Sequence, residues 1–78
     1  MMEIELISFG KISDFIKNQT IVLTDISNTD ELKAFLETSF PALANIKYKF
    51  ALNNDLVQEN SNISNHDTVA IMPPFSGG

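Results

Sequence analysis

A chain of 78 residues without cysteine forms one small domain, and it excludes both a disulfide framework and a thiolate–metal site. The formal charge of −5, from five lysines and ten acids, argues against nucleic-acid binding, which needs clustered cations. It favours either a basic protein partner or simple solubility. Because no secretory signal and no apolar run of membrane-spanning length is visible, we expect a soluble cytoplasmic protein without membrane contact.

The first part of the chain predicts two strands separated by a short segment. The stretch from Ile4 to Phe9 carries apolar side chains on both faces, which is typical of a strand covered on both sides. Gly10 indicates a break. Residues 11–19 are compatible with either a turn or a single helical turn. A second strand is expected from Thr20 to Thr24.

The middle of the chain predicts the main helix. Asn28 is a suitable N-cap with Glu31 three positions later, which is the spacing of a capping box. Pro41 ends the helix, because a proline disfavours helical backbone at the residue before it. A single apolar face follows helical spacing in Leu32, Phe35, Leu36 and Phe40.

Three further strands are expected after a loop that runs through Asn45. Residues 47–53 alternate, which predicts a half-buried strand, and Asn53 to Asp55 form a turn signal. Leu56 and Val57 follow as a short returning strand. After a polar loop anchored by Ile63, residues 68–72 form the last strand. In the alternating strand, Tyr48, Phe50 and Leu52 share one face, and Lys47, Lys49, Ala51 and Asn53 share the other.

This order of elements predicts an α+β fold, a mixed sheet of four to five strands with one main helix packed across it. Order and length match a β-grasp, the ubiquitin-like fold, in which the first and last strands are parallel and central. We expect a β-grasp domain over residues 1–72 and a projecting tail over residues 73–78.

The tail holds the most informative residues, which are Pro73, Pro74, Phe75, Ser76, Gly77 and Gly78. The prolines fix their φ angles and lack N–H donors, so they predict a stiff stem leaving the sheet. The two glycines lack a Cβ and suit a narrow channel, and the tip ends in an α-carboxylate. A frayed terminus is the alternative. Phe75 is either an anchor in a partner's groove or a cover folded back on the sheet.

These residues resemble the MoaD-like and ThiS-like ubiquitin-fold sulfur carriers, and most of all the molybdopterin synthase small subunits. The family's last strand and tail read as an acidic turn, Val-Ala, apolar residues, Pro-Pro, two variable residues and Gly-Gly, as do residues 67–78 here. Phe9, Phe40-Pro41 and the stretch from Phe50 to Asn53 also resemble family positions. The chain departs from the family at Asn65-His66-Asp67, where Gly-Asp is common, and in the short segment of residues 11–19.

The resemblance implies a chemistry centred on Gly78. A ubiquitin-activating-like adenylyltransferase would use ATP to adenylate its carboxylate, and a sulfur donor such as a cysteine desulfurase or rhodanese would convert it to a thiocarboxylate. Gly77 and Ser76 would occupy a channel in the large synthase subunit, with which the chain would form a heterotetramer. Phe75, Pro74, Pro73 and Phe9 would contact partners. The sulfur would go to a cyclic pyranopterin precursor to form the molybdopterin dithiolene.

No other constellation indicates catalysis by this chain. His66 is the single histidine, and one histidine beside Asp67 provides neither a metal-ligand set nor a triad. A surface turn is the better interpretation. We therefore expect a non-catalytic subunit of a sulfurtransferase complex, without a bound cofactor or metal.

Three alternatives remain open at this stage. The same carboxylate would serve a sulfur carrier for thiamine or for tRNA thiolation. It would also serve a ubiquitin-like modifier that forms isopeptide bonds. A plain binding module with an incidental tail is the last alternative.

Overall fold

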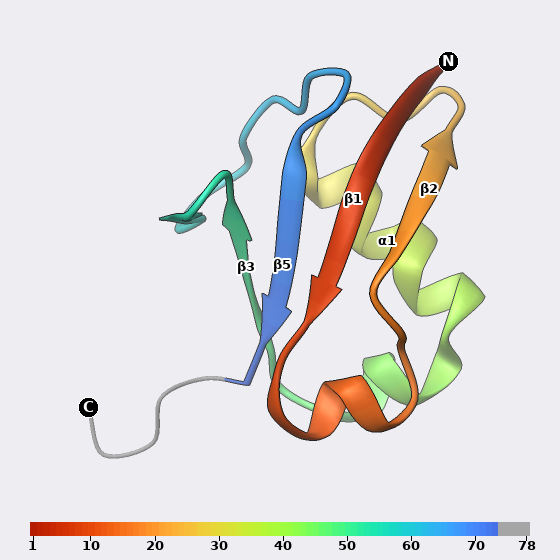
Figure 1. Cartoon of the computed structure of the whole chain (residues 1–78), viewed down its shortest axis with the longest axis vertical. Helices are drawn as coiled ribbons and strands as arrows, with labels where there is room; N and C mark the ends of the chain where they lie inside the picture. The colour runs from red at the N-terminus through yellow and green to blue at the C-terminus, as the bar shows by residue number, and fades with distance from the viewer. Residues whose placement is uncertain (74–78) are drawn as a thin grey trace.

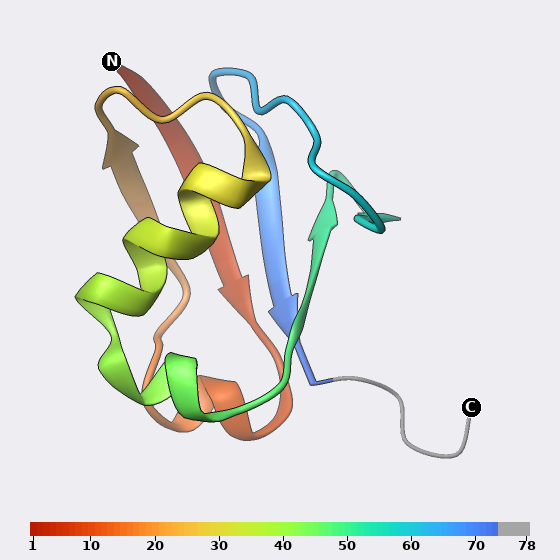
Figure 2. The same cartoon turned by 180° about the vertical axis from the view of Figure 1, so that it is seen from behind.

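A computed structural model describes residues 1–73 of the chain. One helix lies across one face of a five-stranded mixed sheet with strand order β2-β1-β5-β3-β4 (Figures 1 and 2). The predicted α+β class is confirmed. The elements are β1 (Met2–Ser8), η1 (Gly10–Asp14), β2 (Gln19–Leu23), α1 (Thr29–Ser39), η2 (Pro41–Asn45), β3 (Lys49–Leu52), β4 (Asp55–Leu56) and β5 (Thr68–Met72). No helix in residues 1–73 is long and apolar enough to span a membrane.

The centre of the sheet is a parallel pair formed by the first and last strands. Leu6 lies opposite Val69 and Ser8 opposite Ile71, while β2 and β3 flank the pair in antiparallel orientation. The prediction of parallel, central terminal strands is confirmed. Because parallel strands run in the same direction, β1 and β5 end at the same edge of the sheet (Figure 1).

The core lies between the sheet and α1. Alternation along the central strands turns Ile4, Leu6, Val69 and Ile71 toward the helix, and all four are fully buried. Leu32 and Leu36 of α1 meet them and are equally buried. Full burial of one such side chain contributes about 1.5–3 kcal/mol, so this layer is the main favourable term in a domain of this size.

The ends of α1 follow the local sequence signals. Asn28 Oδ1 accepts a hydrogen bond from the Glu31 backbone N–H at 2.9 Å, which confirms the predicted N-cap. Glu31 reaches back one residue further than a capping box requires, since its Oε1 accepts from the Ser27 N–H at 2.9 Å. Pro41 begins the 3₁₀ helix η2, so the helix ends where the proline predicted.

Two 3₁₀ helices close one end of the core (Figure 2). Residues 11–14, part of the segment whose structure the sequence did not decide, lie in η1, where Ile12 is buried. Ile16, just after η1, is fully buried as well. The sequence predicts only a loop through Asn45, but Leu43 of η2 is fully buried. Short 3₁₀ turns lack the long periodicity that makes an α-helix visible in a sequence.

Ala51 lies on the face opposite Phe50, as the alternation predicts, and it is only 6% exposed there. Ala70 of β5 and Leu56 of β4 are its cross-strand neighbours. The neighbouring side chains on both adjacent strands cover the small Ala51 methyl group, although no helix covers this face of the sheet.

Candidate functional site at the base of the C-terminal tail

The parallel central pair places Phe9 beside the end of β5, where Pro73 follows. The Phe9 backbone N–H donates to the Ile71 carbonyl at 3.0 Å, which extends the ladder one residue past β1. Its backbone is extended, with φ −122° and ψ 157°, and its side chain is 50% exposed. The predicted partner-binding residue Phe9 is therefore exposed next to Pro73.

Gly10 packs directly against the first tail residue. Its φ of +60° lies in the left-handed region, where a side chain is strained. A Cβ at this position would lie 2.9 Å from Pro73 Cγ and 3.4 Å from Pro73 Cδ. Glycine is thus required twice here, for the turn into η1 and for the close approach of the proline ring.

A hydrogen bond to the side chain of Asn18 supports the end of β1. The Ser8 N–H donates to Asn18 Oδ1 at 2.8 Å, just before β2 begins at Gln19. The Ser8 hydroxyl is buried and finds no partner among the described residues. The end of β1 is therefore held on both sides, by Asn18 and by the Ile71 carbonyl.

The face of the sheet that α1 does not cover carries an apolar surface beside the ends of β1 and β5. Alternation places Ile7 and Phe9 on that face, together with the half-buried Ala70 and Met72 of β5. We call Ile7, Phe9, Ala70, Met72 and Pro73 the tail-base surface. A contiguous apolar surface around an exposed aromatic is typical of a protein-binding site.

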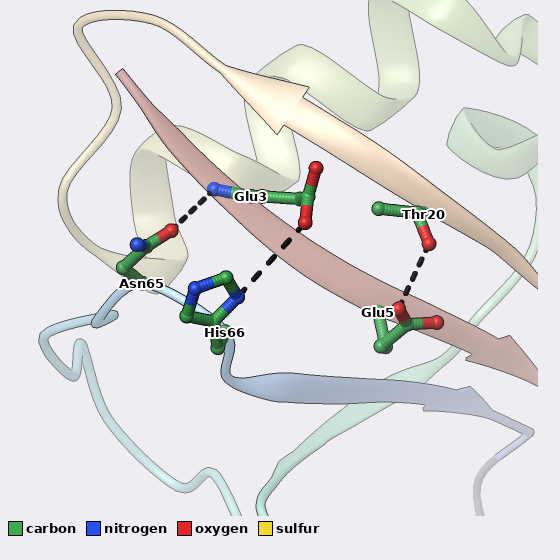
Figure 3. Close-up of polar contacts among 5 residues, drawn as sticks. All are labelled: Glu3, Glu5, Thr20, Asn65 and His66. Carbon is green, nitrogen blue, oxygen red and sulfur yellow. Dashed lines mark hydrogen bonds and ion pairs between the residues drawn. The ribbon is translucent and has the colours of Figure 1, made fainter.

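A group of polar side chains on the open face lies toward the start of β1 (Figure 3). Glu3 N–H donates to Asn65 Oδ1 at 2.8 Å, and the Thr20 hydroxyl donates to Glu5 Oε1 at 2.8 Å. His66 lies in the exposed turn before β5, where its φ is +69° and its Nδ1 lies 3.9 Å from Glu3 Oε1. The surface-turn interpretation of His66 is confirmed, and residues 1–73 contain no cluster of three potential metal ligands.

The structure places only two of the residues predicted for the site. Phe9 and Pro73 are brought together, whereas Pro74, Phe75, Ser76, Gly77 and Gly78 lie outside the described residues. The roles predicted for those five remain predictions.

Gly10 and Met72 were not predicted as site residues. A glycine directly after a strand was the available signal for Gly10, but it was interpreted only as a break.

Nearly the whole chain matches one protein family. The family model described as ThiS family matches residues 6–78, nearly the whole chain. The chain belongs to the ThiS family. The resemblance to these sulfur carriers is therefore confirmed.

Two similar proteins match nearly the full length of this ThiS-family chain. It is 35% identical to the molybdopterin synthase sulfur carrier subunit of Chlamydomonas reinhardtii, over 99% of this chain and all of that protein. It is also similar to a chain in the solved complex of subunits 1 and 2 of the molybdopterin-converting factor from Helicobacter pylori 26695. That match has a TM-score of 0.70 and 28% identity, and it covers 99% of this chain and all of the other.

Proposed function

We propose that this ThiS-family chain is the sulfur carrier subunit of a molybdopterin synthase. The observation that carries the proposal is the full-length match to a protein of that name at 35% identity. The match to a chain of the molybdopterin-converting factor complex supports the same assignment and a large synthase subunit as partner.

The proposed reagent is the carboxylate of Gly78. Its oxygen attacks the α-phosphorus of ATP on an activating adenylyltransferase, which releases pyrophosphate and leaves an acyl-adenylate. A sulfur nucleophile from a persulfide donor then displaces AMP, and reductive cleavage of the resulting acyl disulfide by a thiol leaves a thiocarboxylate. The match of the family model through residue 78 supports assigning this role to the Gly-Gly end.

The tail-base surface supports how the carrier would be held. A partner that covers Phe9 and Met72 contacts the point from which the tail starts, so docking and tail insertion take place on the same side. The exposed aromatic ring supplies interface area, and the Gly10–Pro73 contact fixes the direction in which the chain leaves β5. We propose that the protein acts in the cytoplasm, and that its own side chains supply no catalytic group.

The proposal is tested with purified chain, its organism's activating enzyme, ATP and a sulfur source. Intact mass spectrometry should show the replacement of one oxygen by sulfur, and the loaded chain with the large subunit should convert the cyclic pyranopterin precursor to molybdopterin. A variant extended by one alanine after Gly78 should show neither, while keeping its thermal stability. Loading without conversion by the large subunit would instead indicate a carrier for thiamine or tRNA thiolation, and higher-mass isopeptide adducts would indicate a modifier.

A further inference from the structure

Three of the five lysines of this acidic chain line one groove outside the tail-base surface. The groove lies between α1 and the start of β3 and has a volume of about 520 Å³. We call it the lysine groove. Its lining residues are Lys33, Glu37, Ala44, Ile46, Lys47, Tyr48 and Lys49.

A fixed aromatic wall organises the groove. The Tyr48 hydroxyl donates to Glu37 Oε2 at 2.5 Å, and the Tyr48 ring packs edge-on against Phe50 with centroids 5.5 Å apart. Lys33 Nζ lies 5.6 Å from the ring centroid. Three contacts from two elements therefore hold the ring in place, and Ile46, 39% exposed, adds apolar surface beside it.

The charge of the groove is opposite to that of the molecule. Three lysines and one acid, Glu37, line it, and Glu37 already accepts the Tyr48 hydrogen bond. No lysine lies within 4.0 Å of a carboxylate among the described residues, where the single ion pair joins His66 and Glu3. The ammonium groups are thus available to an anionic partner, while the net charge of −5 repels such a partner elsewhere.

The shape of the groove favours an extended segment over a small anion. A second hollow of about 610 Å³ shares Lys33, Tyr48 and Lys49 with the lysine groove and continues along β4. Asp30 and Glu59 line that second hollow. A bound segment would therefore place its acidic side chains over the lysines and uncharged residues in the second hollow, beside Asp30 and Glu59.

The position of the groove connects it to the tail. Lys49 pairs with Met72, the last residue of β5 and a member of the tail-base surface. The start of β3 therefore lies next to the end of β5 (Figure 2), so a protein that covers the tail-base surface lies within reach of the lysine groove.

We propose that the lysine groove binds an acidic segment of the large synthase subunit that receives the tail. This inference rests on the proposed function. The segment orients the carrier, because aspartate or glutamate side chains contact Lys33, Lys47 and Lys49 while its backbone or an apolar side chain packs on Tyr48 and Ile46.

The test is a charge reversal with a matched control. Lys47→Glu and Lys17→Glu change the net charge equally, and both side chains are exposed, but only Lys47 lines the groove. Binding to the large subunit, measured by calorimetry, should weaken about tenfold for K47E at roughly 50 mM salt and about twofold at roughly 500 mM, because exposed charges are screened. K17E should stay within about twofold of the unaltered chain at both salt concentrations, since a charge at the rim or outside an interface contributes little.

Carbodiimide cross-linking, which joins amines to carboxylates, locates the contact directly. In the complex, Lys47 or Lys49 should be linked to aspartate or glutamate of the large subunit. Equal effects of K47E and K17E, or cross-links from Lys11 and Lys17 alone, would overturn the acidic-segment proposal while leaving the proposed function intact. Failure of the unaltered chain to bind the large subunit at any salt concentration would overturn both.

Discussion

At the scale of single residues, Gly10 connects the fold to the tail. It combines a left-handed backbone with the close approach of Pro73 Cγ, and neither tolerates a side chain. We expect Gly10→Ala to lower the free energy of unfolding by about 1–3 kcal/mol, the usual cost of a strained backbone position. Urea denaturation measures this loss, and the rate of sulfur loading should fall with it because the start of the tail is displaced.

A second variant separates the two causes at Gly10. In Gly10→Ala/Pro73→Ala the proline ring is gone, so the contact is relieved while the strain of the positive φ remains. We expect the double variant to regain part of the stability and to stay below the unaltered chain. If Gly10→Ala had the same free energy of unfolding as the unaltered chain, the close packing of Gly10 against Pro73 would be contradicted.

Two buried hydroxyls provide a further comparison between residues. The Ser8 hydroxyl finds no partner in residues 1–73, whereas Thr29 Oγ1 accepts from the Ser61 N–H at 2.9 Å. Ser8→Ala should leave stability unchanged or raise it by up to about 1 kcal/mol, because an unpaired buried hydroxyl is unfavourable. Thr29→Ala should lower it by about 1–2 kcal/mol, because it leaves the Ser61 N–H unpaired.

Chemical denaturation of both variants gives the two values under one condition. A loss from Ser8→Ala as large as that from Thr29→Ala would mean that the Ser8 hydroxyl is hydrogen-bonded in solution.

At the scale of elements, the contact between Tyr48 and Glu37 joins the start of β3 to α1. Burial, followed by the hydrogen bond to Glu37 and its negative charge, raises the pKa of the Tyr48 phenol above its ordinary value of 10.0. The folded chain therefore keeps this proton at a pH where the unfolded chain has lost it. The stability that depends on the protonated phenol is complete below about pH 10 and is lost as the pH rises toward the folded pKa.

Tyr48→Phe tests this dependence. The variant lacks the titrating group, so its free energy of unfolding should decline less steeply than that of the unaltered chain between about pH 9 and pH 11. Urea denaturation across that range measures both slopes. Glu37→Gln should give an intermediate slope, since it removes the charge but leaves the burial of the ring. Identical slopes for all three proteins would contradict the raised pKa.

At the scale of the whole molecule, the open face of the sheet along β1 has an apolar end and a polar end. Phe9, at the apolar end, is 50% exposed, and Val22, which pairs with Glu3 at the polar end, is 53% exposed. Phe9→Ala should therefore weaken binding to the large subunit by about tenfold or more, with little change in unfolding free energy. Calorimetric titration measures the affinity.

Val22→Ala is the matched control for that experiment, because it removes a similarly exposed apolar side chain outside the tail-base surface. Its affinity should stay within about twofold of the unaltered chain. Equal losses from the two substitutions would show that the partner does not discriminate between the ends of the face.

Most element boundaries were predictable because their causes are local. The last strand has the predicted bounds, and β1 and β2 differ by one or two residues at their ends. The cap at Asn28 and the turn at Asn53 and Asn54, whose φ angles are +50° and +74°, depend on neighbouring residues alone.

The sequence by itself determined the α+β class, the main helix and the residues proposed to carry the chemistry, because periodicity, capping and the Pro-Pro…Gly-Gly pattern are properties of adjacent residues. The tertiary structure alone decided that Phe9 lies beside the end of β5, that Gly10 must lack a side chain, that Ala51 is buried and that three lysines line one groove. Each of these depends on segments distant in the chain, which only the pairing of β1 with β5 and the packing of α1 against β3 bring into contact.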